Sequence, residues 1–139
     1  MNVISLKKKT IVITGAGSGI GQETARVVSQ LGAKVAMLDI SEKGLFATES
    51  LLLGDGHTKY VVDLTNTDKL SSLVQKIVSD NGPIAGFVHC AGISSRKPLN
   101  VLSKDGFDKV MDINFYSFVE LTRLISKKKN FTAEGGSIV

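Results

Sequence analysis

The sequence predicts an α/β fold with a doubly wound parallel sheet. Short apolar runs alternate with longer amphipathic stretches along the 139 residues, and this order is typical of parallel strands joined by helical crossovers. The first apolar run leads directly into a glycine-rich bend, and a helical pattern follows that bend. With 42% hydrophobic and 22% charged residues, the composition fits a single globular domain spanning 1–139.

The first part of the chain predicts two strand–helix pairs. Strand 10–13 precedes a helix over about 20–31, which Gly32 ends. Strand 34–38 follows, and Ser41 is placed to cap the helix after it. Parallel strands need such crossovers, so each helix should return the chain to the starting edge of the next strand.

The rest of the chain continues the alternation. Strands are expected at about 58–62, 84–88 and 135–139. One helix is expected from Thr67 to a turn at 81–83, and another over about 105–127. The Asn81-Gly82-Pro83 turn ends the first of these helices, and a loop over 93–104 precedes the second. Residues 135–139 form only a turn and the opening of the fifth strand, so we expect the sheet to be truncated there.

The bend at 14–21 has the glycine spacing of a Rossmann-type dinucleotide-binding turn. Gly15 can adopt φ values that a Cβ resists. Gly19 lets the backbone approach a pyrophosphate, and Gly21 lets the next helix pack closely on the strand. The N-terminus of that helix would then present free N–H groups to the anion.

Asp39 predicts which nucleotide this turn would take. It ends the second strand, 24 residues after Gly15, where a carboxylate can accept hydrogen bonds from the ribose 2′-OH of NAD. The same carboxylate would repel the 2′-phosphate of NADP, and the adjacent Ile40 supplies no cation. The alternative is that Asp39 only caps the following helix.

Other candidate residues follow the third and fourth strands. Asp63 lies at the edge of the sheet where α/β proteins bind ligands, although it could equally stabilise its own turn. Cys90, Ala91 and Gly92 place small residues beside the same crevice, or form a plain turn. We do not expect Cys90 to be a nucleophile, because strand alternation points His89 to the other face.

Asn114 interrupts the apolar stripe of the long helix, which runs from Phe107 to Ile125. An amide buried in such a stripe needs hydrogen-bond partners. It could bond a neighbouring backbone segment, or hold a water molecule or a catalytic group at the crevice.

Composition argues against several classes of protein. The net charge of +4 comes largely from Lys7–Lys9 and Lys127–Lys129, which we interpret as solvated segment ends, so no nucleic-acid partner is expected. No apolar run is long enough to span a membrane, and no secretion signal precedes Thr10. The single cysteine fits a reducing, cytoplasmic location. We assign no metal ligands.

Together these motifs resemble the N-terminal part of the short-chain dehydrogenase/reductase family. Residues 14–21 match its Thr-Gly-x-x-x-Gly-x-Gly turn, and 135–139 resemble the start of its fifth strand. The sequence 89–92, His-Cys-Ala-Gly, stands where the family usually has Asn-Asn-Ala-Gly. Asp63-Leu64 resembles its adenine-contacting pair, and Asn114 matches the helix asparagine of its catalytic tetrad.

The resemblance implies a hydride transfer between NAD(H) and a small alcohol or carbonyl substrate, in an enzyme that forms homo-oligomers. It assigns Asn114 as the catalytic residue present. The cofactor-binding residues it implies are Gly15, Ser18, Gly19, Ile20, Gly21, Asp39, Ile40, Asp63, Leu64, Cys90, Ala91 and Gly92.

The family's catalytic serine and Tyr-x-x-x-Lys motif do not occur in residues 1–139. Tyr60 and Tyr116 are followed four positions later by Leu64 and Glu120. We therefore expect this chain to be the cofactor-binding part of the enzyme, without the catalytic half and inactive alone. Two alternatives are a non-catalytic nucleotide-binding module and a methyltransferase, and the motifs at 89–92 and 114 argue against the second.

Overall fold

The computed structural model describes residues 4–139 and confirms the doubly wound α/β fold. Five parallel strands form one sheet in the order β3-β2-β1-β4-β5. The strands are β1 Thr10–Thr14, β2 Lys34–Asp39, β3 Thr58–Val61, β4 Ile84–His89 and β5 Ser137–Ile138. Residues 1–3, at the start of the segment searched for a secretion signal, lie outside the described residues.

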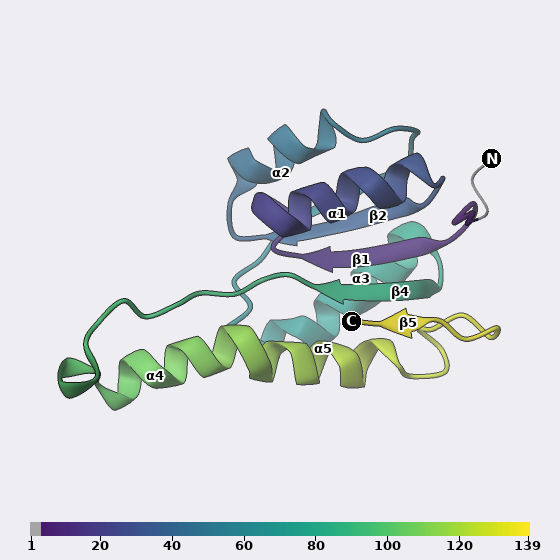
Figure 1. Cartoon of the computed structure of the whole chain (residues 1–139). Helices are drawn as coiled ribbons and strands as arrows, with labels where there is room; N and C mark the ends of the chain where they lie inside the picture. The colour runs from purple at the N-terminus through teal and green to yellow at the C-terminus, as the bar shows by residue number, and fades with distance from the viewer. Residues whose placement is uncertain (1–3) are drawn as a thin grey trace.

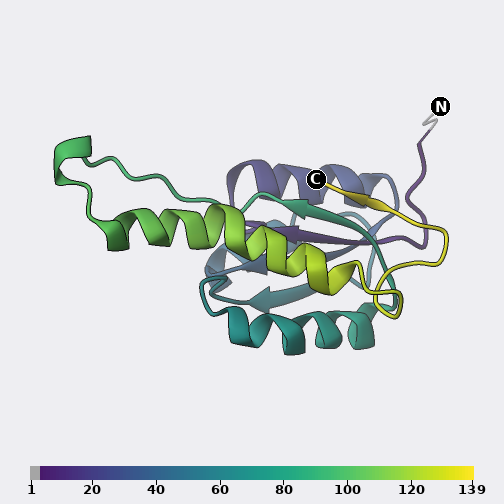
Figure 2. The ribbon, with the colours of Figure 1, turned by 90° about the horizontal axis from the view of Figure 1, so that it is seen from below.

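Helices cover both faces of the sheet (Figures 1 and 2). The α-helices are α1 Gly19–Gln30, α2 Glu42–Glu49, α3 Leu70–Asn81, α4 Lys104–Met111 and α5 Ser117–Ile125. Short turns of 3-10 helix lie at Thr67–Lys69 and Leu99–Val101, and a π-helical turn, η3, spans Asp112–Tyr116. Helices α1 and α2 pack on one face, and α3 and α5 on the other.

Alternation along the central strand β1 separates two buried clusters. Ile11 and Ile13 face α1 and α2, in a cluster that also contains Leu45. Val12 faces the other way, in a cluster with Phe87 and the apolar side chains of α3 and α5. Because β1 is buried on both faces, its sequence is a continuous apolar run, as expected for the centre of a parallel sheet.

The long helix predicted over about 105–127 is present from Lys104 to Ile125, but a π-helical turn lies in its middle. Helix α4, the π turn η3 and helix α5 follow one another without a gap. Only the α5 part covers the sheet. Helix α4 projects beyond the sheet and contributes no buried residue, and the side chain of Phe107, expected in the apolar stripe, is 53% exposed. The π turn inserts an extra residue, so the stripe does not continue on the same face.

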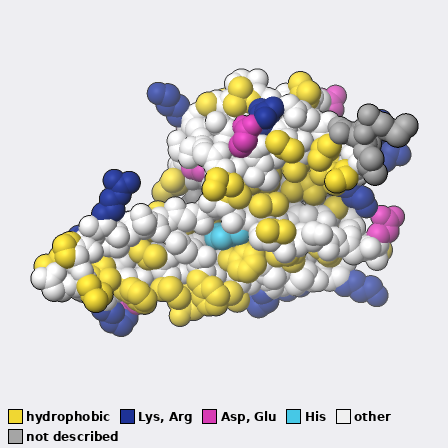
Figure 3. All heavy atoms as spheres, viewed as in Figure 1, with side chains coloured by type: hydrophobic (Ala, Val, Ile, Leu, Met, Phe, Trp, Pro, Cys, Tyr) yellow, Lys and Arg dark blue, Asp and Glu magenta, His cyan; other side chains and the backbone are white. Residues whose placement is uncertain are grey.

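This projecting segment, 93–111, is here named the arm. It consists of the loop after β4 and of α4, and it is drawn at the left of Figures 1 and 2. Hydrophobic side chains gather along it on the face shown in Figure 3. Leu99, Val101 and Phe107 of the arm are exposed. Among residues 4–139, no helix has both the length and the apolarity needed to cross a membrane.

Candidate functional site

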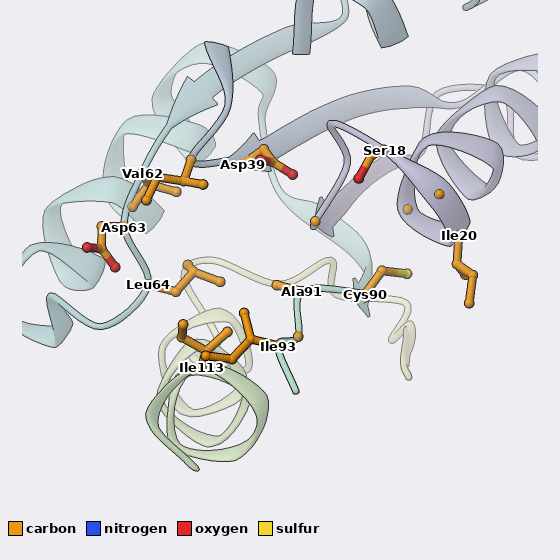
Figure 4. A pocket seen from close by; sticks show the side chains of 15 residues that line it. Ser18, Ile20, Asp39, Val62, Asp63, Leu64, Cys90, Ala91, Ile93 and Ile113 are labelled. Carbon is orange, nitrogen blue, oxygen red and sulfur yellow. The ribbon is translucent and has the colours of Figure 1, made fainter. Parts of the chain in front are cut away.

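One pocket brings together all twelve residues that the sequence analysis assigned to cofactor binding. It has a volume of about 380 Å³ and lies at the carboxyl ends of β1, β2 and β4 (Figure 4). The strand order reverses at β1, between β2 and β4, and open α/β sheets bind ligands at such a point. The binding role of each residue stays a prediction, but their convergence on one pocket is a structural fact.

The glycine turn is held in a conformation that side chains would prevent. Gly15 and Gly19 have φ values of +65° and +53°, in the region that favours glycine. A Cβ on Gly15 would also lie 2.7 Å from the amide nitrogen of Ala91. A Cβ on Gly21 would lie 2.1 Å from the Gly15 carbonyl oxygen. The turn therefore touches both the end of β4 and the first turn of α1.

The N-terminus of α1 opens into the pocket without an internal cap. Ser18 is the N-cap residue, but its hydroxyl accepts no bond from the helix, and Ser18 and Ile20 are labelled at the pocket edge in Figure 4. The first N–H groups of a helix have no partner within it, and they carry a partial positive charge. This end of the pocket is therefore suited to an anionic group.

Asp39 lies across the glycine turn and binds it. Its Oδ2 accepts a hydrogen bond of 2.9 Å from the Gly17 N–H, and its Oδ1 accepts one of 2.8 Å from the Ser41 N–H. The Ser41 hydroxyl itself caps α2, by accepting from the Gly44 N–H. Asp39 thus organises both the turn and the entry to α2, and each of its oxygens keeps a further lone pair for a ligand hydroxyl.

Asp63 and Leu64 form the far wall of the pocket (Figure 4). Asp63 Oδ1 accepts from both the N–H and the hydroxyl of Thr65, so the turn-stabilising role considered for Asp63 is present. These bonds, the backbone one first, lower the pKa of the Asp63 carboxyl. Leu64 is only 8% exposed and belongs to the core, which anchors this wall to the sheet.

The end of β4 divides its side chains between the two faces, as strand alternation predicted. Cys90 packs against the cluster beneath α1, whereas the His89 ring lies against Phe118 of α5, with ring centroids 5.5 Å apart. His89 Nδ1 is 2.9 Å from the hydroxyl of Thr14, and its Nε2 is 3.2 Å from the Ile113 carbonyl oxygen. Burial lowers the pKa of the His89 imidazole, and the bond to Ile113 acts in the opposite direction.

Asn114 is exposed, so the expectation of an amide buried in an apolar stripe is wrong. The reason is that η3 turns its segment toward the loop after β4. There the Asn114 side chain pairs with one backbone residue, accepting from the Ile93 N–H at 2.8 Å and donating to the Ile93 carbonyl at 2.9 Å. The backbone-bonding role considered for Asn114 is therefore present in the structure.

The sequence analysis did not predict three apolar residues of the pocket, nor the contacts of His89 beside it. Val62, Ile93 and Ile113 also line the pocket, and each directly precedes or follows a residue that was assigned. The sequence places His89 on the face opposite Cys90 but gives no sign of the contacts that its ring makes there. Within residues 4–139, no group of three or more His, Cys, Asp or Glu side chains is placed to hold a metal ion.

A family model described as short chain dehydrogenase matches residues 9–139. The chain belongs to this family. The match decides against the methyltransferase alternative.

Individual relatives agree with the family match. A short-chain dehydrogenase/reductase, ABA4, of Pyricularia oryzae is 29% identical over 146 residues, covering 100% of this chain and 53% of the relative. The 3-oxoacyl-[acyl-carrier-protein] reductase FabG of Thermotoga maritima is 32% identical, covering 86% of this chain and 50% of the relative. The chain therefore spans about half the length of the curated relatives it matches.

Solved structures show the same fold. The 2-keto-3-deoxy-D-gluconate dehydrogenase of Streptococcus agalactiae superposes with a TM-score of 0.80 at 32% identity, covering 97% of this chain and 51% of that protein. The five-stranded sheet is thus the arrangement found in dehydrogenases of this family.

Mild acid will destabilise the folded chain through His89. Burial holds the pKa of its ring below the ordinary 6.5, so the unfolded chain binds this proton at a higher pH than the folded one. The stability contributed by the neutral ring is full above about pH 6.5 and is lost as the pH falls from there toward the folded-state pKa. Thermal melts between about pH 7.5 and 5.5 will show a falling melting temperature.

The control is His89→Asn, which removes the ionisable ring. Its melting temperature will depend less on pH across this range, because the carboxyl groups with lowered pKa titrate below it. Equal pH dependence in both proteins would contradict the assignment to His89.

Proposed function

We propose that the chain is the NAD(H)-binding part of an oxidoreductase that transfers hydride between NAD(H) and an alcohol or carbonyl substrate. The observation that carries this proposal is the meeting of two features in one pocket. The open N-terminus of α1 suits a pyrophosphate, and the Asp39 carboxylate is fixed across the same turn, where a ribose diol would bind.

The other pocket residues fit the remaining parts of a dinucleotide. Asp63 and Leu64, on the wall away from α1, would contact the adenine. Cys90, Ala91 and Gly92 would face the rest of the cofactor through backbone groups and small side chains. NAD(H), when bound, supplies or accepts the hydride, and this chain's residues bind and orient it.

Asn114 is the member of the family's catalytic tetrad that this chain contains. Its amide accepts one hydrogen bond from Ile93 and donates one to it, which fixes its orientation beside the loop after β4. Its remaining donor and acceptor capacity can hold a water molecule or a substrate-side group.

Nucleotide preference tests the proposal. Calorimetric titration will show tighter binding of NAD than of NADP, because Asp39 would lie beside the 2′-phosphate. A close like-charge contact costs about 1–4 kcal/mol at surface-like dielectric. The variant Asp39→Asn removes the charge. It will reduce the difference between the affinities for NAD and NADP, mainly by strengthening NADP binding.

The matched control is Asp63→Asn, which removes the same charge from another residue that lines the pocket. It will change the affinities for both nucleotides alike and preserve their ratio. Equal or tighter binding of NADP by the unaltered chain would refute the assignment to Asp39.

A second prediction concerns turnover. The 139-residue chain will bind NAD but will not oxidise alcohols or reduce carbonyls, because neither Tyr60 nor Tyr116 has a lysine four positions later to lower its pKa. A substrate panel followed by NADH absorbance tests this. Activity that purifies with the chain and disappears in Asn114→Ala would overturn it, whereas binding without turnover is also what a non-catalytic nucleotide-binding module would give.

We also propose that the chain self-associates, in a cytoplasmic setting that its single cysteine favours. Phe107, Phe115 and Val119 are 53%, 50% and 45% exposed on one continuous run of helical turns, and exposed apolar surface of this kind favours association. Light scattering after size exclusion will show species larger than a monomer.

Phe115→Ser will lower the proportion of species larger than a monomer. Its control is Phe46→Ser, since Phe46 is 55% exposed on α2, away from the arm. A monodisperse monomer of the unaltered chain would exclude the proposed surface.

A further inference from the structure

We propose that His89 is a positioning residue that ties the floor of the nucleotide pocket to the turn carrying Asn114. The proposal rests on the proposed function only for its significance, because the link would matter for binding a nucleotide. The link itself is a chain of hydrogen bonds among described residues, and it can be measured without a nucleotide.

The chain of bonds fixes the protonation of the His89 ring atom by atom. The Ile113 carbonyl can only accept, so the proton of the neutral ring lies on Nε2, which is 3.2 Å away. Nδ1 is then an acceptor, and the Thr14 hydroxyl, 2.9 Å away, donates to it. The oxygen of that hydroxyl in turn accepts from the Ala91 N–H at 3.2 Å.

Each end of the chain reaches the pocket. Ala91 lines it directly, and Ile113 both lines it and precedes Asn114. Asn114 then holds Ile93, two residues beyond Ala91, through both of its backbone groups. The loop after β4 is therefore held by hydrogen bonds at two points, to Thr14 of β1 and to Asn114 of η3. The His89 ring connects these two points through its bonds to Thr14 and Ile113.

The surroundings leave the ring little freedom to exchange partners. Thr14 is fully buried at the carboxyl end of the central strand β1. The rings of Phe87 and Phe118 lie beside the His89 ring, with centroid distances of 6.1 and 5.5 Å. The Ile113 carbonyl also accepts from the Ser117 hydroxyl at 2.7 Å, which keeps η3 and the start of α5 in place. A rotated or shortened side chain at position 89 could not serve both Thr14 and Ile113.

Two substitutions separate the two bonds. Asparagine places its amide about where Nδ1 lies, so His89→Asn can keep the hydrogen bond to Thr14 but loses the one to Ile113. Glutamine reaches as far as Nε2, so His89→Gln can keep the hydrogen bond to the Ile113 carbonyl. The readout is amide hydrogen exchange at Ile93, whose N–H is held by Asn114, measured by NMR on the unliganded chain.

Exchange at Ile93 will be about twofold to tenfold faster in His89→Asn than in the unaltered chain, the range that one hydrogen bond accounts for. In His89→Gln it will stay close to the unaltered value. The control is His57→Asn, since His57 bonds Val35 and Leu53 away from the pocket, and it will leave Ile93 unchanged. Equal effects of Asn and Gln at position 89, or none, would overturn the proposal.

The unaltered chain gives an independent test that does not require the variants to fold. Nitrogen-15 spectra of the ring at neutral pH will show His89 as the neutral tautomer protonated at Nε2. A ring protonated at Nδ1, or at both nitrogens, would also overturn the proposal. Because neither measurement uses NAD, a failure here is distinct from a failure of the chain to bind nucleotide.

Discussion

The close approach of the glycine turn to the end of β4 is the constraint on which the site depends. Gly15 has no space for a Cβ against the backbone of Cys90 and Ala91, and Gly21 has none against the Gly15 carbonyl. These contacts draw together the ends of β1 and β4 and the start of α1. A crevice forms there because the helices connecting the two halves of the sheet leave in opposite directions from β1.

Most of the fold followed from local patterns that the structure bears out. The continuous apolar run of β1, the glycine turn and the caps at Ser41 and Gly32 each depend on neighbouring residues in the chain, so sequence periodicity and turn chemistry were sufficient to place them. The convergence of Asp39, Asp63 and Ala91 on one pocket followed from the rule that parallel strands end at a common edge.

The parts that sequence could not supply depend on partners far along the chain or on a break in periodicity. His89 meets Thr14 across 75 positions, and nothing near His89 in the sequence specifies that contact. The π turn at η3 adds a residue without any marker in composition. The helix expected over about 105–127 therefore carries an irregular turn in its middle, and Asn114 lies at the surface rather than in the core.

The arm gives the chain two levels of local stability. Helix α5 is anchored by Leu121, Leu124 and Ile125 in the core, whereas α4 buries no residue at all. Opening free energy scales with the buried contacts a segment must lose, so α4 can unwind while the sheet stays intact. Asn114 lies in η3, between α4 and α5, so each unwinding event that reaches η3 would release Ile93 from its hydrogen bonds to Asn114. The time for which Ile93 stays ordered at the pocket is then set by fraying of α4 rather than by unfolding of the domain.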